Sequence, residues 1–204
     1  MKRSLASVSA LLFTLALLAG CAGRAPAPES QMRGQWSDQQ SRLEAMNNWQ
    51  LTGKVGLRTP EDSVSANLDW WQSPTYYRLL LSGPFGSGRS TLEGNDQGVT
   101  LITSEGRFQA DTPEALMEEQ LGWSLPVSAL DYWVRGLPTP DASYQRETDA
   151  KGYPLYLQQQ GWEIAYRDWV AAGDVWLPRR LVMSQKGLRA TLVVNQWRLE
   201  PDDE

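Results

Sequence analysis

One turn in the chain comes close to a sequence that binds phosphate groups. Gly83 and Gly88 are separated by four residues, and an Arg-Ser pair follows. This differs by one residue from the phosphate-loop pattern G-x-x-x-x-G-K-[ST], because Arg89 stands where the pattern has lysine. The pattern also requires a helix after the loop, so that backbone amides point at the phosphates. The sequence TLEGNDQGVT that follows has two glycines, an Asn-Asp pair and no helical period, so we do not expect nucleotide binding here.

The residue types that carry most hydrolytic chemistry are absent or isolated. The chain has no histidine, which excludes Ser-His-Asp triads, Cys-His pairs and histidine-ligated metal sites. A pair of carboxylates could hydrolyse a glycosidic bond, and the best candidates are Asp69, beside Trp70 and Trp71, and Asp168, before Trp169. Acids next to aromatic residues on alternating strands are typical of outward-facing polar positions. We therefore expect no catalytic residue, no metal and no cofactor.

The N-terminal residues look like an export signal that ends in a lipid attachment site. Lys2 and Arg3 precede an uncharged apolar run over 5–18, which is short for a bilayer span and has the layout of a secretory signal. The segment Leu18-Ala19-Gly20-Cys21 resembles the lipobox of bacterial lipoproteins, which implies cleavage before Cys21 and acylation of Cys21. The alternative is a signal anchor whose cysteine is incidental. Ala22 is not the aspartate that retains lipoproteins in the inner membrane, which implies the outer membrane.

Charge and composition narrow the possible partners. The chain carries 24 acidic and 19 basic residues, a net charge of −5. Removal of the signal also removes the positive charges of Lys2 and Arg3, so the mature chain is more acidic still. This acidity argues against nucleic acid and against a basic patch that adheres to anionic lipid. Residues 22–34 are small, polar and proline-containing, as in a flexible linker. We predict a signal peptide over 1–20, a lipidated tether over 21–34 and one domain over 35–204.

The periodicity predicts one helix, a series of strands, two helices and a second series of strands. Ser37 with Gln40 suggests a capping box for the first helix, and Thr112-Pro113-Glu114 opens the second. Strands that follow one another through short turns should be antiparallel. The expected fold is mainly β with α, a curved antiparallel sheet with about three helices packed on one face. The helices are expected near 36–48, 112–122 and 126–135, and the strands at 50–58, 62–71, 75–82, 98–104, 106–111, 152–160, 162–170, 179–185 and 188–200.

Several strands are apolar on both faces, more than a one-sided sheet requires. Trp70 and Trp71 are adjacent, as are Tyr76 and Tyr77, and adjacent strand residues point to opposite faces. Helices could cover one face and an oligomer the other, or one face could line a cavity for an apolar ligand. The ten tryptophans could also stack on sugars, but most fall at regular strand or helix positions, which favours packing or an apolar cavity.

Several segments together resemble the LolB family of outer-membrane lipoprotein receptors. The resemblance covers nearly all of the mature chain, and its most specific parts are residues 83–86 and 133–138. It implies an incomplete antiparallel β-barrel with helices as a lid over an apolar cavity. The segments are the lipobox, Arg78-Leu79-Leu80-Leu81 with Pro84-Phe85-Gly86 two residues later, Leu121-Gly122, then Pro126, Leu130, Trp133 and Gly136-Leu137-Pro138, and Trp162 with Tyr166.

The resemblance also implies a function and its partners. A member of this family takes acylated lipoproteins from the periplasmic carrier LolA and inserts them into the outer membrane, where it is itself lipid-anchored and faces the periplasm. We expect LolA, acylated lipoproteins and outer-membrane lipid as partners, no nucleic acid, and a monomer. The alternative is an outer-membrane lipoprotein that binds glycan or peptidoglycan.

Individual residues can be assigned to this expected function. The protruding turn of the family usually carries leucine at its tip, where this chain has Phe85. Because Phe is also apolar, we expect Phe85 to insert into the membrane; alternatively, it folds back onto its own core. Alternation and helix face select five candidates for the acyl-chain cavity: Leu68, Trp70, Leu79, Leu81 and Trp133.

Overall fold

The computed structural model describes residues 33–83, 88–121 and 124–199, which form one antiparallel sheet with helices. Cys21 and Phe85, together with the signal and most of the tether, lie outside the described residues. The strands are β1 Trp49–Arg58, β2 Ser63–Gln72, β3 Tyr76–Ser82, β4 Ser90–Asn95, β5 Gly98–Thr103, β6 Gly106–Ala110, β7 Tyr144–Thr148, β8 Pro154–Gln159, β9 Trp162–Ala172, β10 Val175–Gln185 and β11 Leu188–Leu199.

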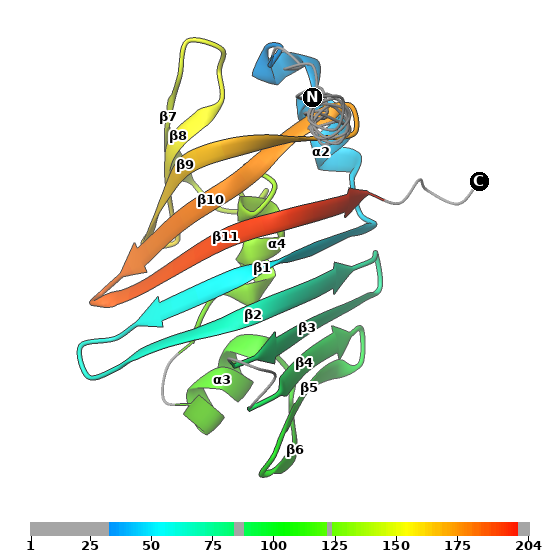
Figure 1. Ribbon diagram of the computed structural model, residues 1–204, viewed down its shortest axis with the longest axis vertical. Helices are drawn as coiled ribbons and strands as arrows, with labels where there is room; N and C mark the ends of the chain where they lie inside the picture. Colours follow the sequence, from blue (N-terminus) through cyan, green and yellow to red (C-terminus); the bar gives the residue numbers. More distant parts are fainter. Residues whose placement is uncertain (1–32, 84–87, 122–123, 200–204) are drawn as a thin grey trace, which may run out of the picture. The chain divides into compact units, whose positions relative to one another are not determined.

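The sheet has eleven strands in the order β6-β5-β4-β3-β2-β1-β11-β10-β9-β8-β7. Every neighbouring pair is antiparallel, and the first strand pairs with the last in the middle of the sheet (Figure 1). Strands β6 and β7 are at the two edges and do not pair with each other. The sheet is therefore not closed into a barrel, as the expected incomplete barrel requires.

Alternation along the strands defines an inner, apolar face. In β1, Trp49, Leu51 and Leu57 are buried while Lys54 and Arg58 are exposed, the period-two pattern of a half-buried strand. Leu51 lies opposite Trp70 of β2 and Trp197 of β11. The ring of Trp49 is 5.0 Å from that of Trp70 and 5.4 Å from that of Trp197, measured between centroids. This aromatic cluster is part of the hydrophobic core.

The helical segments are η2 (Trp36–Asp38), α2 (Gln40–Ala45), α3 (Pro113–Leu121) and α4 (Val127–Trp133). Helix α3 contacts β5 and β6, and α4 buries Val127, Ala129, Leu130 and Trp133. Helix α4 runs across the sheet behind β1 and β11, and α2 is near the end of the sheet where β11 finishes (Figure 1). No helix in the described part of the chain is long and apolar enough to cross a membrane.

The expected element order is confirmed, with three differences. The first helical segment is shorter than expected, and the cap at Ser37 is wrong: Ser37 lies inside η2, and the Gln35 amide donates to the Asp38 carboxylate at 3.1 Å instead. Strands β4 and β7 were not expected. Strand β4 follows the turn that resembles a phosphate loop, so the helix that such a loop needs is not there.

The start of α3 agrees with the sequence. The backbone amide of Ala115 donates to the Thr112 hydroxyl at 3.2 Å, the N-terminal cap that Thr-Pro-Glu predicts. The end of α4 also agrees, because Gly136 adopts a positive φ of 83° and its amide donates to the Trp133 carbonyl at 3.0 Å. Glycine is the residue that adopts this conformation without strain.

Candidate functional site

Four of the five expected cavity residues form one patch on the inner face. Leu68 pairs with Leu81 and Trp70 pairs with Leu79, so the two cross-strand pairs are adjacent between β2 and β3. Trp70, Leu68 and Leu79 are 2%, 7% and 8% exposed, and Leu81 is half-buried. The patch is part of the packed hydrophobic core, and its role as a cavity lining stays a prediction.

The fifth expected residue, Trp133, lies in a different environment. It is fully buried on α4, its ring is 6.3 Å from that of Trp162 on β9, and its indole Nε1 donates to Gln159 Oε1 of β8 at 3.0 Å. These partners are on the other side of β1 and β11 from the patch in the order of the sheet. Trp133 therefore holds α4 to the sheet, whether or not it also contacts a ligand.

Along β2 the inner face becomes progressively exposed towards the β1–β2 turn, whereas on β1 Leu57, directly opposite Val64, stays buried. Along β2, Trp70 and Leu68 are buried, Ala66 is half-buried and Val64 is 56% exposed. All four share one face because they are two residues apart. A single exposed apolar residue is common on a protein surface, but Val64 continues a face whose inner part belongs to the core, so it marks the point where the cover over that face ends. We call Val64, Ala66, Leu68 and Trp70 the graded strip.

The residues on either side of the segment 84–87, which contains Phe85, lie beside this strip. Ser82, the last residue of β3, lies opposite Asn67, and Ser90, the first residue of β4, lies opposite Leu81. Both described flanks of residues 84–87 are therefore level with the middle of the graded strip. Phe85 itself is outside the described residues, so its insertion into a membrane stays a prediction.

A buried side-chain amide, which the sequence analysis did not identify, fixes α4 to the sheet. Gln159, 2% exposed, accepts hydrogen bonds at Oε1 from Trp133 Nε1 (3.0 Å) and from the Thr139 amide (2.9 Å). Its Nε2 donates to the carbonyls of Thr139 (3.0 Å) and Ala142 (2.9 Å). Four hydrogen bonds satisfy this side chain completely, and they join α4 and the segment after it to β8.

Two further contacts hold α4 in place. The Tyr166 hydroxyl of β9 donates to the Trp133 carbonyl at 3.1 Å, and burial raises the pKa of this hydroxyl, so it stays a donor. Arg135, 3% exposed, donates from Nη1 to the carbonyls of Leu43 (2.6 Å) and Met46 (2.8 Å). A cation at these last carbonyls stabilises the end of α2.

Arg135, in the turn after α4, also pairs with a partly buried acid of that helix. Its Nη2 is 3.3 Å from Asp131 Oδ2. Burial raises the pKa of Asp131, and the Arg135 guanidinium opposes this change without cancelling it. The desolvation of the carboxylate therefore outweighs its ion pair.

Helix α3 is held in a different way. Leu116 is fully buried and Met117 is 7% exposed. Helix α3 is joined to α4 by an exposed hydrogen bond, in which the Ser128 amide donates to Glu114 Oε1 at 3.0 Å. A carboxylate at the first turn of α4 is stabilised by the helix dipole. The cover over the inner face is thus fixed by buried hydrogen bonds at α4 and by an exposed carboxylate at α3.

The two carboxylates considered for glycoside hydrolysis are not a pair. Asp69 on β2 accepts a hydrogen bond from Gln50 Nε2 at 2.7 Å, and Asp168 on β9 lies 3.7 Å from the Arg179 guanidinium. Strands β1, β11 and β10 separate them in the sheet. Within the ranges that the structure describes, no group of three or more Cys, Asp and Glu residues could hold a metal ion.

Comparison with known structures shows the fold. A DUF1329 family protein from Desulfovibrio piger superposes with a TM-score of 0.53 at 6% identity and covers 80% of this chain and 90% of its own. A LolA superfamily protein from Nitrosomonas europaea superposes with a TM-score of 0.50 at 10% identity and covers 80% and 94%. At such low identities these likenesses concern the architecture only.

Comparison with known sequences shows the family. The family model described as outer membrane lipoprotein LolB matches residues 47–197. A protein of Chromohalobacter salexigens named outer-membrane lipoprotein LolB is 59% identical over 192 residues, which are 94% of this chain and 90% of the relative. A protein of Pseudomonas putida with the same name is 45% identical over 193 residues, 92% and 94% of the two chains. This chain therefore belongs to the LolB family of outer-membrane lipoproteins.

Proposed function

We propose that the protein accepts acylated lipoproteins from the periplasmic carrier LolA and inserts them into the outer membrane. The relatives' shared name, outer-membrane lipoprotein LolB, supports this function over a glycan-binding lipoprotein. The structural observation that carries it is the graded strip, in which the inner face passes from the buried Trp70 to the 56% exposed Val64. An acyl chain can follow such a strip from solvent towards the core.

The physical chemistry of the cargo explains why such a strip is useful. Burial of each CH₂ group contributes about 0.8 kcal/mol, so a chain of about sixteen carbons resists exposure to water by roughly 12 kcal/mol. Handover without a cofactor must run downhill, from carrier to receptor to bilayer. The receptor therefore needs an apolar surface of intermediate affinity, and a strip that is buried at one end and open at the other provides it.

Membrane attachment and membrane contact complete the proposal. Cys21 carries the lipid anchor, residues 21–34 are the tether, and Phe85 inserts transiently into the bilayer. The segment with Phe85 begins and ends level with the graded strip, which supports delivery of the acyl chain next to the point of membrane contact. In this proposal the protein works as a monomer that moves lipoproteins and catalyses no reaction.

A matched pair of aspartates tests the strip. Val64→Asp places a charge on the exposed end of the inner face, whereas Ser65→Asp places the same charge one residue away on the outer face, also at an exposed position. Substitutions at exposed positions such as these change stability by about 0.5 kcal/mol or less. With both variants folded, transfer of a labelled lipoprotein from LolA to liposomes should be several-fold slower for Val64→Asp only. Equal rates for the two variants would remove the graded strip from the pathway.

A further inference from the structure

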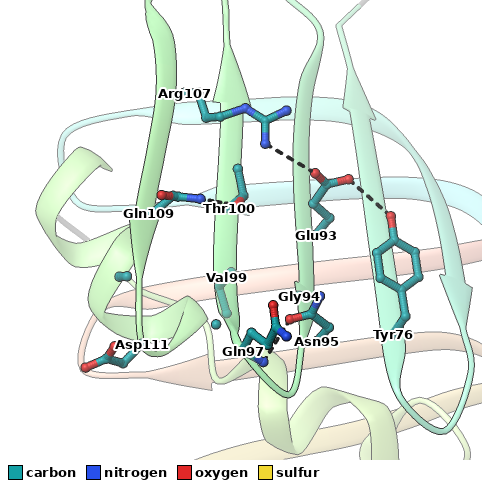
Figure 2. Close-up of a pocket in the computed structure, with 12 residues that line it drawn as sticks. Tyr76, Glu93, Gly94, Asn95, Gln97, Val99, Thr100, Arg107, Gln109 and Asp111 are labelled. Atoms are coloured by element: carbon teal, nitrogen blue, oxygen red, sulfur yellow. Dashed lines mark hydrogen bonds and ion pairs between the residues drawn. The ribbon is translucent and has the colours of Figure 1, made fainter.

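A hollow lies on the opposite face of the sheet from the graded strip. Its volume is about 520 Å³, and it is lined by residues of β3, β4, β5 and β6 and of the turns beside them (Figure 2). Tyr76, Glu93, Thr100 and Gln109 alternate along their strands with Tyr77, Leu92, Leu101 and Phe108, which belong to or pack against the core. Lipoprotein transfer through the inner face leaves this outer hollow without a role.

The side chains of the hollow are arranged as a cross-strand row. Glu93 of β4 lies opposite Thr100 of β5, and Thr100 lies opposite Gln109 of β6, so all three point to the same side. Gln109 Nε2 donates to Thr100 Oγ1 at 3.4 Å. A carboxylate, a hydroxyl and an amide, all carrying further hydrogen-bonding capacity, are thereby presented side by side, as Figure 2 shows.

The carboxylate in this row is held in a defined position. The Tyr76 hydroxyl donates to Glu93 Oε2 at 3.1 Å, and the Arg107 guanidinium lies 3.9 Å from Glu93 Oε1. Partial burial and the hydrogen bond to Glu93 raise the pKa of Tyr76, so its phenol remains a donor. A pre-positioned acceptor reduces the entropy lost when a ligand binds.

One aromatic ring, that of Tyr76, lines the hollow, and a second ring outside the lining supports it. Tyr76 packs against Trp71, with ring centroids 5.5 Å apart and planes inclined at 55°. Both rings are half-buried, so part of their surface is accessible. Aromatic faces bind the apolar face of a flat, hydroxylated ring, while the polar groups beside them bind its edge.

The charges of the hollow and its edge are nearly balanced. Two carboxylates, those of Glu93 and Asp111, and one guanidinium, that of Arg107, belong to the lining, and Arg78 lies directly opposite Glu93 on β3. The remaining polar side chains of the lining are neutral amides and hydroxyls, among them Asn95, Thr100 and Gln109. A neutral ligand rich in hydroxyl and amide groups, with an apolar face for Tyr76, matches these features.

We infer that the hollow between β3 and β6 is a binding site for a neutral oligosaccharide, separate from the surface used for lipoproteins. Glu93 and Gln109 bind sugar hydroxyls, and the ring of Tyr76 packs on the face of a pyranose. A protein anchored at the outer membrane and facing the periplasm meets such chains in the glycan of the cell wall. Binding them would hold the receptor at a defined depth between membrane and wall.

Titration calorimetry on the mature, lipidated chain in detergent tests this site. The probes are the tetramer of N-acetylglucosamine, which represents cell-wall glycan, and cellotetraose, a neutral tetramer without N-acetyl groups. Saturable binding of either probe is expected; binding of the first alone identifies an N-acetylated glycan as the ligand. Absence of binding for both overturns the inference.

Substitutions locate the binding. Glu93→Gln keeps the shape of the side chain, and Tyr76→Ala removes the ring; each should weaken binding about tenfold, the effect of 1.4 kcal/mol. Gln158→Ala, at an exposed position of β8 outside the hollow, is the control and should bind normally. Unchanged binding by Glu93→Gln overturns the inference, even if Tyr76→Ala fails to fold. Lipoprotein delivery should be normal in Glu93→Gln, so failure of this site leaves the proposed function intact.

Discussion

Replacement of Gln159 by leucine should destabilise the domain strongly, although leucine has a similar size and is apolar. The side chain is 2% exposed and makes four hydrogen bonds that join α4 and the following segment to β8. Leucine can make none of them. The indole N–H of Trp133 and the amide of Thr139 would then be buried without acceptors, and two carbonyls would lose a donor.

The expected loss follows from the cost of unsatisfied groups. Each buried donor or acceptor left without a partner costs about 1–3 kcal/mol. Two donors at the middle of this range give about 4 kcal/mol, and the carbonyls, which can accept from water or relax, add less. For a domain of this size, about 1 kcal/mol shifts Tm by roughly 2–4 °C, so Gln159→Leu should lower Tm by roughly 10 °C.

Thermal unfolding of Gln159→Leu beside Gln158→Leu measures this effect. Gln158 is the preceding residue on β8, is exposed and faces the other way. Its replacement by leucine should therefore change stability by about 0.5 kcal/mol or less. If the two variants unfold within about 2 °C of each other, the amide network does not anchor α4, and the apolar contacts of Trp133 with the contacts of Tyr166 and Arg135 must do so.

Three further substitutions follow from the structure and the proposed function. Gly136→Ala should lower Tm by several degrees, because Gly136 has a φ of +83° and an added Cβ would lie 2.8 Å from a tryptophan ring. The control is Gly56→Ala, where an added Cβ meets nothing within 4 Å. Equal losses of Tm in the two variants would contradict the argument. Asp131→Asn should stabilise the protein at neutral pH. Because the pKa of Asp131 is raised in the folded state, the free energy of unfolding of the wild type is highest at acidic pH and falls as this carboxyl ionises; asparagine does not ionise. Denaturant titrations should show the gap between variant and wild type closing as the pH falls, and a gap that widens would show that the ion pair dominates. Phe85→Glu should accept lipoprotein from LolA and hold it, with Tm near wild type, but fail to release it into liposomes; a large drop in Tm would instead place Phe85 in the core, and normal delivery would exclude insertion.

The part of the site that sequence reasoning located is the part that local periodicity determines. Leu68, Trp70, Leu79 and Leu81 were selected by alternation, and a short antiparallel turn between their strands then fixes the cross-strand pairs. The exposure of Val64 could not be predicted, because alternation assigns a residue to a face but does not say where the helices that cover that face end.

Other features depend on contacts between distant residues. The indole of Trp133 is bonded to Gln159, 26 residues away, and Gln159 sits in a run of three glutamines that resembles a solvent-facing segment. Strand β7 is exposed along its whole length, so no apolar pattern marks it. Strand β4 was missed because Glu93, Gly94 and Asn95 interrupt its alternation, and Gly94 and Asn95 are residues that strands disfavour.

The pairing of β1 with β11 has a consequence for how the protein reaches its compartment. The central ladder joins residues 49–58 to residues 189–199, so the middle of the sheet cannot form until almost the whole chain is present. Contacts between segments so far apart in sequence form slowly. A chain that is still crossing a membrane N-terminus first therefore cannot complete its central ladder until the last strand is available. A truncation before β11 would leave β1 and β10 as two new unpaired edges in the centre of the sheet, where they invite aggregation.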